Sequence, residues 1–292
     1  MSPSRREPKI RNIPIVLLVV ALFATSTLAA VPVTLAATPA LDCGGVACVA
    51  TVGSASGGSS HPITMSGSLS TSSSPDLIVV IVTGDVTGDT PATPTLSGVT
   101  FSSVCTLTNS APIIAIYAGK AASTLSSATV SETESGNAGS ATGGMVAFGI
   151  SNYDTTDASP FDGTCTPVAG SGTTPSQTVS SLSDGNDFIF AGVTTSGGTL
   201  SATGATTLIV ANTGTVYSAA GYQNGGGGGS YTLAFSAASG SWSEGVVAVK
   251  SSTPTAVPLF PSGVLPILVT LPLLYYLAAR WRKSEPVLGE SP

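Results

Sequence analysis

The stretch Asp76-Leu77-Ile78-Val79-Val80-Ile81-Val82-Thr83 places an acidic residue before an unbroken run of mostly β-branched apolar side chains. It has a counterpart in Asp187-Phe188-Ile189-Phe190-Ala191-Gly192-Val193-Thr194. Short apolar runs that are bounded by turn-forming residues are typical of buried β-strands. The two stretches therefore predict equivalent strands in two halves of the chain.

Further runs rich in Val, Ile and Thr follow the same pattern, with Gly, Ser and Asn between them. The expected strands cover residues 77–83, 113–117, 145–150, 188–193, 206–210, 231–235 and 246–250. Helical periodicity is missing outside the two ends of the chain. Many short strands with Gly-rich turns are typical of a sandwich or barrel, so the expected fold class is all-β.

The motifs of the first half recur in the same order in the second half. Gly144-Met145-Val146-Ala147 resembles Gly245-Val246-Val247-Ala248, at an offset of roughly 100 residues, far above solenoid periods. This predicts duplicated half-repeats at about 62–165 and 166–252. They form either one jelly-roll-like β-sandwich or two small sandwiches. We favour the single sandwich, because each half has few strands with which to close its own core.

The N-terminal segment has the layout of a secretory signal. Four basic residues precede an apolar run over residues 13–23, and small residues follow. Residues 27–29 and 34–36 both offer a site that a signal peptidase reads, and an uncleaved N-terminal anchor is the alternative. Residues 1–36 are therefore expected to be a signal peptide or anchor, and residues 37–252 the exported domain.

The C-terminal segment predicts a membrane anchor. Val257-Pro258-Leu259-Phe260-Pro261 precedes an apolar run over residues 264–279. A bilayer core asks for about 20 apolar helical residues, a length that is reached when residues 257–261 are included. Basic flanking residues favour the cytoplasmic side, and here they are Arg280, Arg282 and Lys283. We expect a linker with a sorting motif at 253–263, a transmembrane helix at 264–279 and a cytoplasmic tail at 280–292.

Charge is divided unevenly along the chain. Seven of the nine basic residues lie in the two end segments. Between Asp42 and Ser252, two lysines stand against twelve carboxylates, which gives a net charge of −10. We expect an acidic, lysine-poor surface, which argues against nucleic acid or anionic lipid as a partner because both require basic surfaces.

The cysteine content of the chain agrees with export. Four cysteines in an oxidising compartment suggest two disulfides, and three connectivities are possible. We expect Cys43 to pair with Cys48, its neighbour in sequence, and Cys105 to pair with Cys165. The second disulfide would join the first half to the link between the halves.

The chain shows no catalytic constellation. The only histidine, His61, lies in a flexible polar stretch before the first strong strand, so a serine or cysteine triad has no well-placed base. We interpret the acidic stretch over residues 151–162 as a connector. Asp85 and Asp89 lie four apart in a Gly-containing turn, a spacing that calcium can use, but the further ligands of an EF-hand loop are missing. We expect no catalytic residue, cofactor or metal, with these two aspartates as the calcium alternative.

The C-terminal segment resembles the PEF-CTERM sorting signals of archaeosortase and exosortase substrates. The resemblance is carried by Val257, Pro258, Phe260 and Pro261, while Leu259 stands where that family has Glu. It implies a sortase-like processing enzyme as a partner. The domain is similar to the Ser/Thr/Gly-rich β-sandwich modules of secreted microbial surface proteins, through the strand openings described above and the closing residues 239–250.

The sequence thus predicts a non-enzymatic, membrane-anchored extracellular surface protein with a structural or adhesive role. The alternative is a carbohydrate-binding module, which requires aromatic side chains along one groove. The candidate aromatics are Tyr153, Tyr217, Tyr222, Tyr231 and Trp242. Tyr222 and Trp242 are the expected ligand contacts. A glycan, or another copy that pairs through edge strands, would be the partner.

Overall fold

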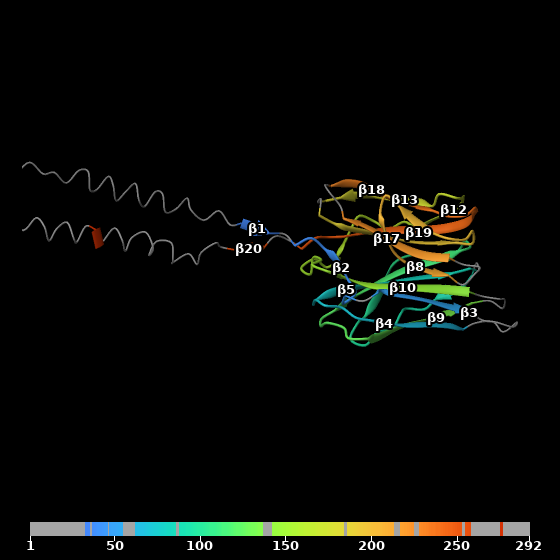
Figure 1. Ribbon diagram of the computed structural model, residues 1–292, viewed down its shortest axis with the longest axis horizontal. Helices are drawn as coiled ribbons and strands as arrows, with labels where there is room; N and C mark the ends of the chain where they lie inside the picture. Colours follow the sequence, from blue (N-terminus) through green and yellow to red (C-terminus); the bar gives the residue numbers. More distant parts are fainter. Residues whose placement is uncertain are drawn as a thin grey trace, which may run out of the picture. The chain divides into compact units, whose positions relative to one another are not determined.

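A computed structural model describes residues 33–35, 37–45, 47–54, 62–85, 88–136, 142–183, 186–212, 217–224, 228–252, 255–257 and 275–276. The chain divides into two compact units. One is the domain Ala36–Thr253, and the other comprises the two ends, Met1–Leu35 and Pro254–Pro292. Figure 1 shows the strands of the domain.

In the unit formed by the two ends, strand β1 (Val33–Leu35) pairs antiparallel with β20 (Thr255–Val257). The predicted signal segment before Val33 lies outside the described residues. So does the predicted transmembrane helix, apart from Tyr275 and Tyr276, which are helical. No helix within the described part of the chain is long and apolar enough to cross a membrane.

The described residues of the first half of the domain form nine strands. They are β2 (Ala40–Asp42), β3 (Val49–Ser54), β4 (Ile63–Leu69), β5 (Asp76–Gly84), β6 (Thr90–Pro91), β7 (Phe101–Leu107), β8 (Ile113–Ala121), β9 (Ala128–Ser135) and β10 (Thr142–Ser151). A six-stranded antiparallel sheet has the order β2-β10-β5-β8-β7, and β3 also pairs with β10. A smaller sheet has the order β4-β9-β6.

The second half repeats this topology strand by strand. Its strands are β11 (Phe161–Asp162), β12 (Val168–Gly172), β13 (Ser176–Leu182), β14 (Phe188–Thr195), β15 (Ser201–Thr203), β16 (Thr206–Asn212), β17 (Tyr217–Asn224), β18 (Gly229–Ser236) and β19 (Gly240–Val249). The six-stranded sheet has the order β11-β19-β14-β17-β16, with β12 on β19, and the smaller sheet has the order β13-β18-β15. Each strand takes the place of the strand nine positions before it.

The all-β prediction is confirmed, and each expected strand overlaps an observed one. The single jelly-roll-like sandwich that we favoured is not formed, because each half forms a sandwich of its own. The reason is strand number. Short strands that the sequence pattern did not predict, among them β2, β3 and β6 in the first half and β11, β12 and β15 in the second, bring the described residues of each half to nine strands. In these sheets the first half contributes β2 to β10 and the second half contributes β11 to β19.

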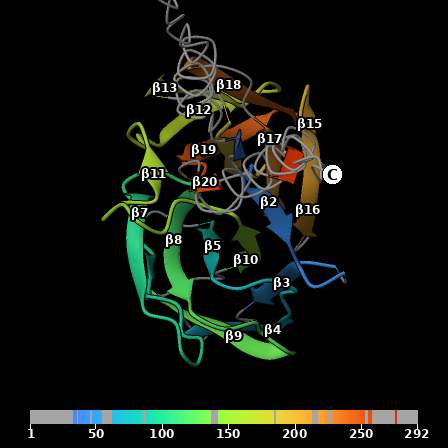
Figure 2. The same cartoon turned by 90° about the vertical axis from the view of Figure 1, so that its left-hand side faces the viewer.

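Three buried clusters define the layers of the domain. Successive residues of a strand point to opposite faces. Val80 therefore packs with Met65 of β4 in one cluster, while Val79 packs with Phe190 of β14 in another. A third cluster joins Phe235 of β18 to the far face of β14. The six-stranded sheets lie face to face, with a three-stranded sheet outside each of them (Figures 1 and 2).

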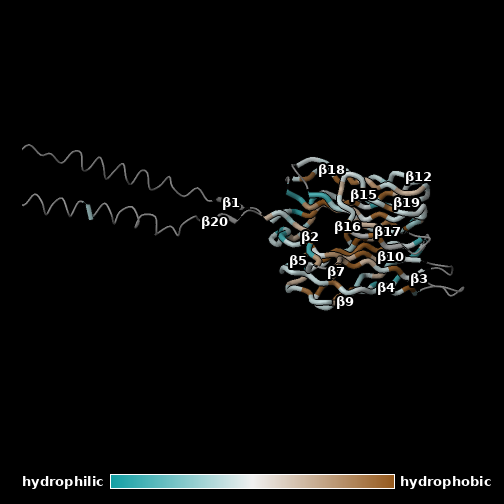
Figure 3. The backbone as a smooth tube through the Cα atoms, viewed as in Figure 1, coloured by the Kyte–Doolittle hydropathy of each residue, from teal (hydrophilic) through white to brown (hydrophobic). Residues whose placement is uncertain are grey.

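This layering explains the unbroken apolar runs. Strands β5 and β14 are buried on both faces along their whole length, so neither shows the alternation of a half-exposed strand. Figure 3 shows the resulting brown, hydrophobic stretches near β10, β17 and β19. A Phe148–Phe190 contact joins the two inner sheets, with ring centroids 5.4 Å apart in an edge-to-face arrangement.

Candidate functional site

Both predicted disulfides are confirmed. Cys43 bonds to Cys48 in the loop between β2 and β3. Cys105 of β7 bonds to Cys165, which lies between β11 and β12, so this disulfide joins the two sandwiches covalently. All four cysteines of the chain are used.

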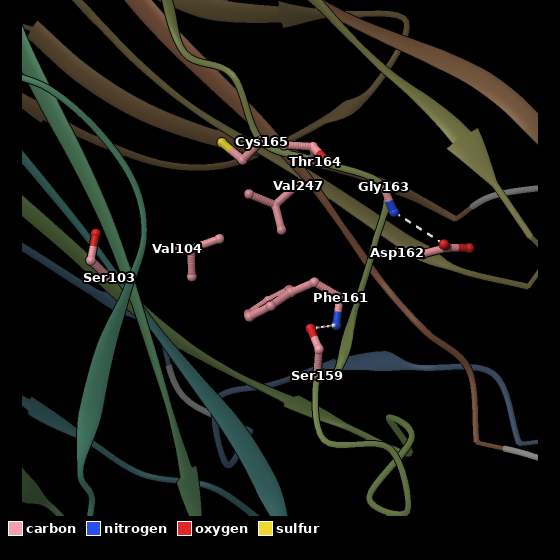
Figure 4. A pocket seen from close by; sticks show the side chains of 9 residues that line it. All are labelled: Ser103, Val104, Ser159, Phe161, Asp162, Gly163, Thr164, Cys165 and Val247. Atoms are coloured by element: carbon pink, nitrogen blue, oxygen red, sulfur yellow. Dashed lines mark hydrogen bonds between the residues drawn. The ribbon is translucent and has the colours of Figure 1, made fainter.

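A pocket of about 240 Å³ lies beside the disulfide that joins the sandwiches. Figure 4 shows its lining side chains, with Ser103 and Val104 from β7 on one side and Phe161 near Val247 on the other. Asp162 also lines it, but its carboxylate already accepts hydrogen bonds from Gly163 and Ser183. The described lining residues include no histidine, lysine or arginine that could activate a serine hydroxyl.

The carboxylates are the unexpected feature of the domain. Nine of the twelve between Asp42 and Glu244 are buried: Asp42, Asp76, Asp89, Glu132, Glu134, Asp154, Asp162, Asp187 and Glu244. Asp157 is exposed and forms a 2.5 Å ion pair with Lys250. The expected acidic surface is therefore wrong, because the acidic residues are used mainly inside the domain.

Two of the buried carboxylates clamp loops. Asp42 accepts hydrogen bonds of 2.6–3.0 Å from the amides and hydroxyls of Ser72 and Ser73 and from the Gly44 amide. Burial would raise the pKa of Asp42, but these hydrogen bonds outweigh burial and hold the pKa well below its ordinary value. Asp162 accepts in the same way from Ser183, and its pKa is also lowered.

The acidic residue that precedes each long apolar run lies beside such a clamp. Asp76 is fully buried, and burial raises its pKa to about 6 against the lowering effect of a Thr71 hydrogen bond, with a smaller raising effect from Asp42. In the second half, Asp187 shares a hydrogen bond with Asp162. Each aspartate that the sequence pattern singled out therefore lies near the clamp aspartate of its own half, Asp76 near Asp42 and Asp187 near Asp162.

The calcium candidates serve a different purpose. The Asp85 carboxylate accepts hydrogen bonds from the Thr142 amide at 3.0 Å and from the Thr142 hydroxyl at 2.8 Å, so it closes the loop after β5 onto β10. Asp89 is buried. Across the described ranges, no three His, Cys, Asp or Glu side chains are grouped so that they could hold a metal ion. This arrangement gives the calcium alternative no support.

The acidic connector contains a clamp of its own. Asp154 accepts hydrogen bonds from the Thr156 amide at 2.8 Å and from the Thr156 hydroxyl at 2.6 Å. These bonds, led by that of the hydroxyl, lower the pKa of Asp154. The interpretation of residues 151–162 as a connector fits these bonds.

Sequence reasoning missed three buried glutamates. Burial raises the pKa of Glu132 to about 7, of Glu134 to about 9 and of Glu244 to about 8. A signal was present for two of them, because Glu132 and Glu134 follow Val130 at intervals of two in β9. Residues at this interval share a face of the strand, and Val130 is buried.

The aromatic candidates do not line one groove. Tyr222 of β17 packs toward the other sandwich, with its ring stacked 5.1 Å from Phe188. Trp242 of β19 lies against Gly170 and, by strand alternation, shares the opposite face of the sheet with Val246. The other three are also packed: Tyr153 is buried beside Lys120, and Tyr217 and Tyr231 pack against the third buried cluster, which contains Phe235.

A pocket of about 450 Å³ contains one of these aromatics. Tyr222, Gln223 and Asn224 of β17 line it together with residues 204–206. It combines one aromatic ring with polar side chains at the edge of the six-stranded sheet.

Most of the expected sorting and anchoring residues lie outside the described residues. Val257 is the last residue of β20. Pro258, Phe260 and Pro261 are not described, nor are Arg280, Arg282 and Lys283. No protein-family model, curated protein or solved structure matches this chain.

Proposed function

We propose that the protein is a non-enzymatic surface protein that is exported, held in the membrane by its C-terminal segment, and displays its double sandwich outside the cell in a structural or adhesive role. Its signal peptide would direct export, a sortase-like enzyme would process its C-terminal segment, and its partners would be the membrane, another copy or a glycan.

The observation that carries the proposal is where the chain enters and leaves the domain. The Ser252 hydroxyl donates a hydrogen bond to the Ala37 carbonyl at 3.1 Å. The first and last described residues of the domain therefore lie side by side. A domain whose two connections leave together can be tethered at one place, so that the rest of its surface is free for contacts.

The disulfides support export. Disulfides persist in oxidising compartments and are rare where thiols are kept reduced. This chain commits every cysteine to one, and the Cys105–Cys165 bond joins the sandwiches. A protein displayed outside the cell gains resistance to unfolding from such a link.

The outer sheets support a role in contact rather than in chemistry. Their exposed positions carry hydroxyl pairs across neighbouring strands, including Thr64 with Thr133 at 3.1 Å and Thr178 with Thr232 at 2.7 Å. Cross-strand pairs of this kind stabilise a sheet. A hydroxyl-covered face with little charge fits a neutral polar partner, such as a glycan or another copy.

Carbohydrate binding is the second candidate, and the Tyr222 pocket is the observation that favours it. A glycan array probed with the wild type, Tyr222→Ala and Trp242→Ala tests it. Loss of binding in the Tyr222 variant alone would support this pocket. An array without signal for the wild type would remove the candidate and leave the structural role.

Membrane fractionation tests the proposed function. The full chain is expected in the membrane fraction after alkaline carbonate washing, whereas a chain that ends at Ser252 is expected in the medium. Recovery of both chains from the cytosol would contradict export. Recovery of both from the membrane would contradict anchoring by the C-terminal segment.

A further inference from the structure

Glu134 is a carboxyl group that the first sandwich encloses without an opposing charge. It lies on β9 opposite Ile63 of β4, and its side chain is fully buried. Neither of its carboxyl oxygens has a hydrogen-bond partner among the described residues. Enclosing a carboxylate in this way is costly, whereas a neutral acid costs much less to bury.

Two glycines leave the space that this carboxyl occupies, and we call this space the seat. Gly84 of β5 and Gly143 of β10 face each other across the six-stranded sheet. A Cβ atom on Gly84 would overlap Oε1 of Glu134, and one on Gly143 would lie 2.6 Å from Oε2. The carboxyl of the outer sheet therefore reaches the backbone of the inner sheet at a point where no larger residue fits.

Among the described residues, the charged groups that act on this carboxyl are all acidic. Glu132 lies on the same strand, and Asp85 and Asp89 come from the loop between β5 and β6. Burial, followed by Asp89, Glu132 and Asp85, raises the pKa of Glu134 to about 9. A raised pKa is expected for a buried carboxyl among like charges.

The other groups near the seat bring no positive charge. The Glu132 carboxylate accepts a hydrogen bond from the Ala92 amide at 2.7 Å, and the Tyr117 hydroxyl of β8 donates to the Pro91 carbonyl at 3.0 Å. The two lysines of the domain have other neighbours, since Lys120 lies over the Tyr153 ring and Lys250 pairs with Asp157.

We infer that Glu134 is the proton-binding element of a pH-sensitive switch in the first sandwich. As a neutral acid, Glu134 packs against Gly84 and Gly143, so that the sheet of β4, β9 and β6 lies tightly on the six-stranded sheet. When the proton leaves, the carboxylate has no cation to pair with, and the outer sheet loosens. The second sandwich has no such element at the matching strand, because Leu233 and Phe235 occupy the inward positions of β18.

The direction of the pH effect follows from the two states. The unfolded chain releases this proton near the ordinary value of 4.5, and the folded chain releases it near 9. Between these values the folded state binds more protons, so the contribution of Glu134 to stability is complete below about pH 4.5 and is lost as the pH rises toward 9. A single group lowers the folding equilibrium constant by about tenfold per pH unit in this window.

Urea unfolding of the full chain in detergent at pH 5, 7 and 9 tests the switch. We expect the wild-type midpoint to fall with pH, and Glu134→Gln, which keeps the side-chain shape without a titrating proton, to show a smaller fall. Asp157→Asn changes an exposed carboxylate and should follow the wild type. Equal falls in the wild type and Glu134→Gln, or a wild-type midpoint that rises with pH, would overturn the inference.

Hydrogen exchange on the wild type keeps the inference testable if Glu134→Gln does not fold. After correction for the intrinsic effect of pH on exchange, amides of β4 and β9 should lose protection between pH 5 and 9. Amides of β13 and β18 are the internal control in a Glu244→Gln background, because these strands hold the same places in the second sandwich and Glu244 of β19 is the buried carboxyl with a raised pKa there. Equal loss of protection in the two outer sheets would contradict a switch at Glu134.

Discussion

Asp42 and Asp162 hold equivalent positions in the two sandwiches. Asp42 lies opposite Gly149 of β10, and Asp162 lies opposite Ala248 of β19, the matching strand. Asp42 accepts hydrogen bonds from Ser72 and Ser73, and Asp162 accepts them from Ser183; these serines precede the central strand of the respective sandwich. The duplication has thus preserved a loop clamp as well as the strand order.

Removing the charge of these clamps should destabilise the domain. Asp42→Asn replaces an acceptor oxygen with a donor that faces serine amides, and leaving such buried groups unsatisfied costs about 1–3 kcal/mol. We expect Asp162→Asn to cost less, because Asp162 accepts from one serine rather than two. Urea unfolding at pH 7 measures both free energies, with Asp157→Asn as the exposed control. A cost for Asp42→Asn no larger than that of the control would contradict the clamp.

The lowered pKa of Asp42 predicts a loss of stability in acid. This carboxylate is held ionised in the folded state, while the unfolded chain takes up its proton near 3.8. Its contribution is therefore complete above about pH 4 and declines as the pH falls below that value. Between pH 4 and 2 the wild-type melting temperature should fall more steeply than that of Asp42→Asn. Parallel curves for the two proteins would show that Asp42 is not responsible.

The disulfide between the sandwiches should contribute more than the local one. Cys105 and Cys165 are 60 residues apart in sequence, whereas Cys43 and Cys48 are 5 apart. In the chain-entropy model the longer loop gives about 4 kcal/mol and the short loop about 2 kcal/mol. Paired Cys→Ser variants, compared by thermal unfolding, measure the difference. The prediction fails if removal of the Cys43–Cys48 bond lowers stability more.

The contact between Phe148 and Phe190 should couple the two inner sheets. Each ring is fully buried, so truncation to Ala should cost about 3–5 kcal/mol. Because the rings meet edge to face, a double-mutant cycle should give a coupling energy of about 0.5–1.5 kcal/mol. Phe148 with Phe235 is the matched control, since Phe235 belongs to a different core. Coupling of the same size in both pairs would argue against a specific contact.

The strands were predictable because burial on both faces leaves a plain apolar signal. The stretch that begins at Asp76 corresponds to β5, and its counterpart corresponds to β14. The number of sandwiches was harder to predict. Two-residue strands such as β6 and β11 carry no periodicity, and without them each half appears too small to close a core.

The fate of the carboxylates was the largest difference between sequence and structure. A charge tally treats each carboxylate as solvated, because ionised groups are rarely buried alone. Asp42 stays ionised although it is buried, because the amides and hydroxyls of Ser72 and Ser73 donate hydrogen bonds to it. This contact depends on tertiary structure and is not visible in the sequence. Glu134 escapes this rule as a neutral acid whose carboxyl lies against Gly143 of the next strand and Gly84 of β5, and the contact with Gly84 is a feature of tertiary structure.

Labelling of lysines on intact cells tests the proposed surface display most directly. A membrane-impermeant amine reagent, followed by peptide mass spectrometry, compares Lys120, which is exposed on the domain, with Lys283 of the basic tail. We expect Lys120 to be modified on intact cells and Lys283 to be modified only after lysis. Labelling of Lys120 only after lysis, or of Lys283 on intact cells, would contradict a domain displayed outside the cell on a C-terminal anchor.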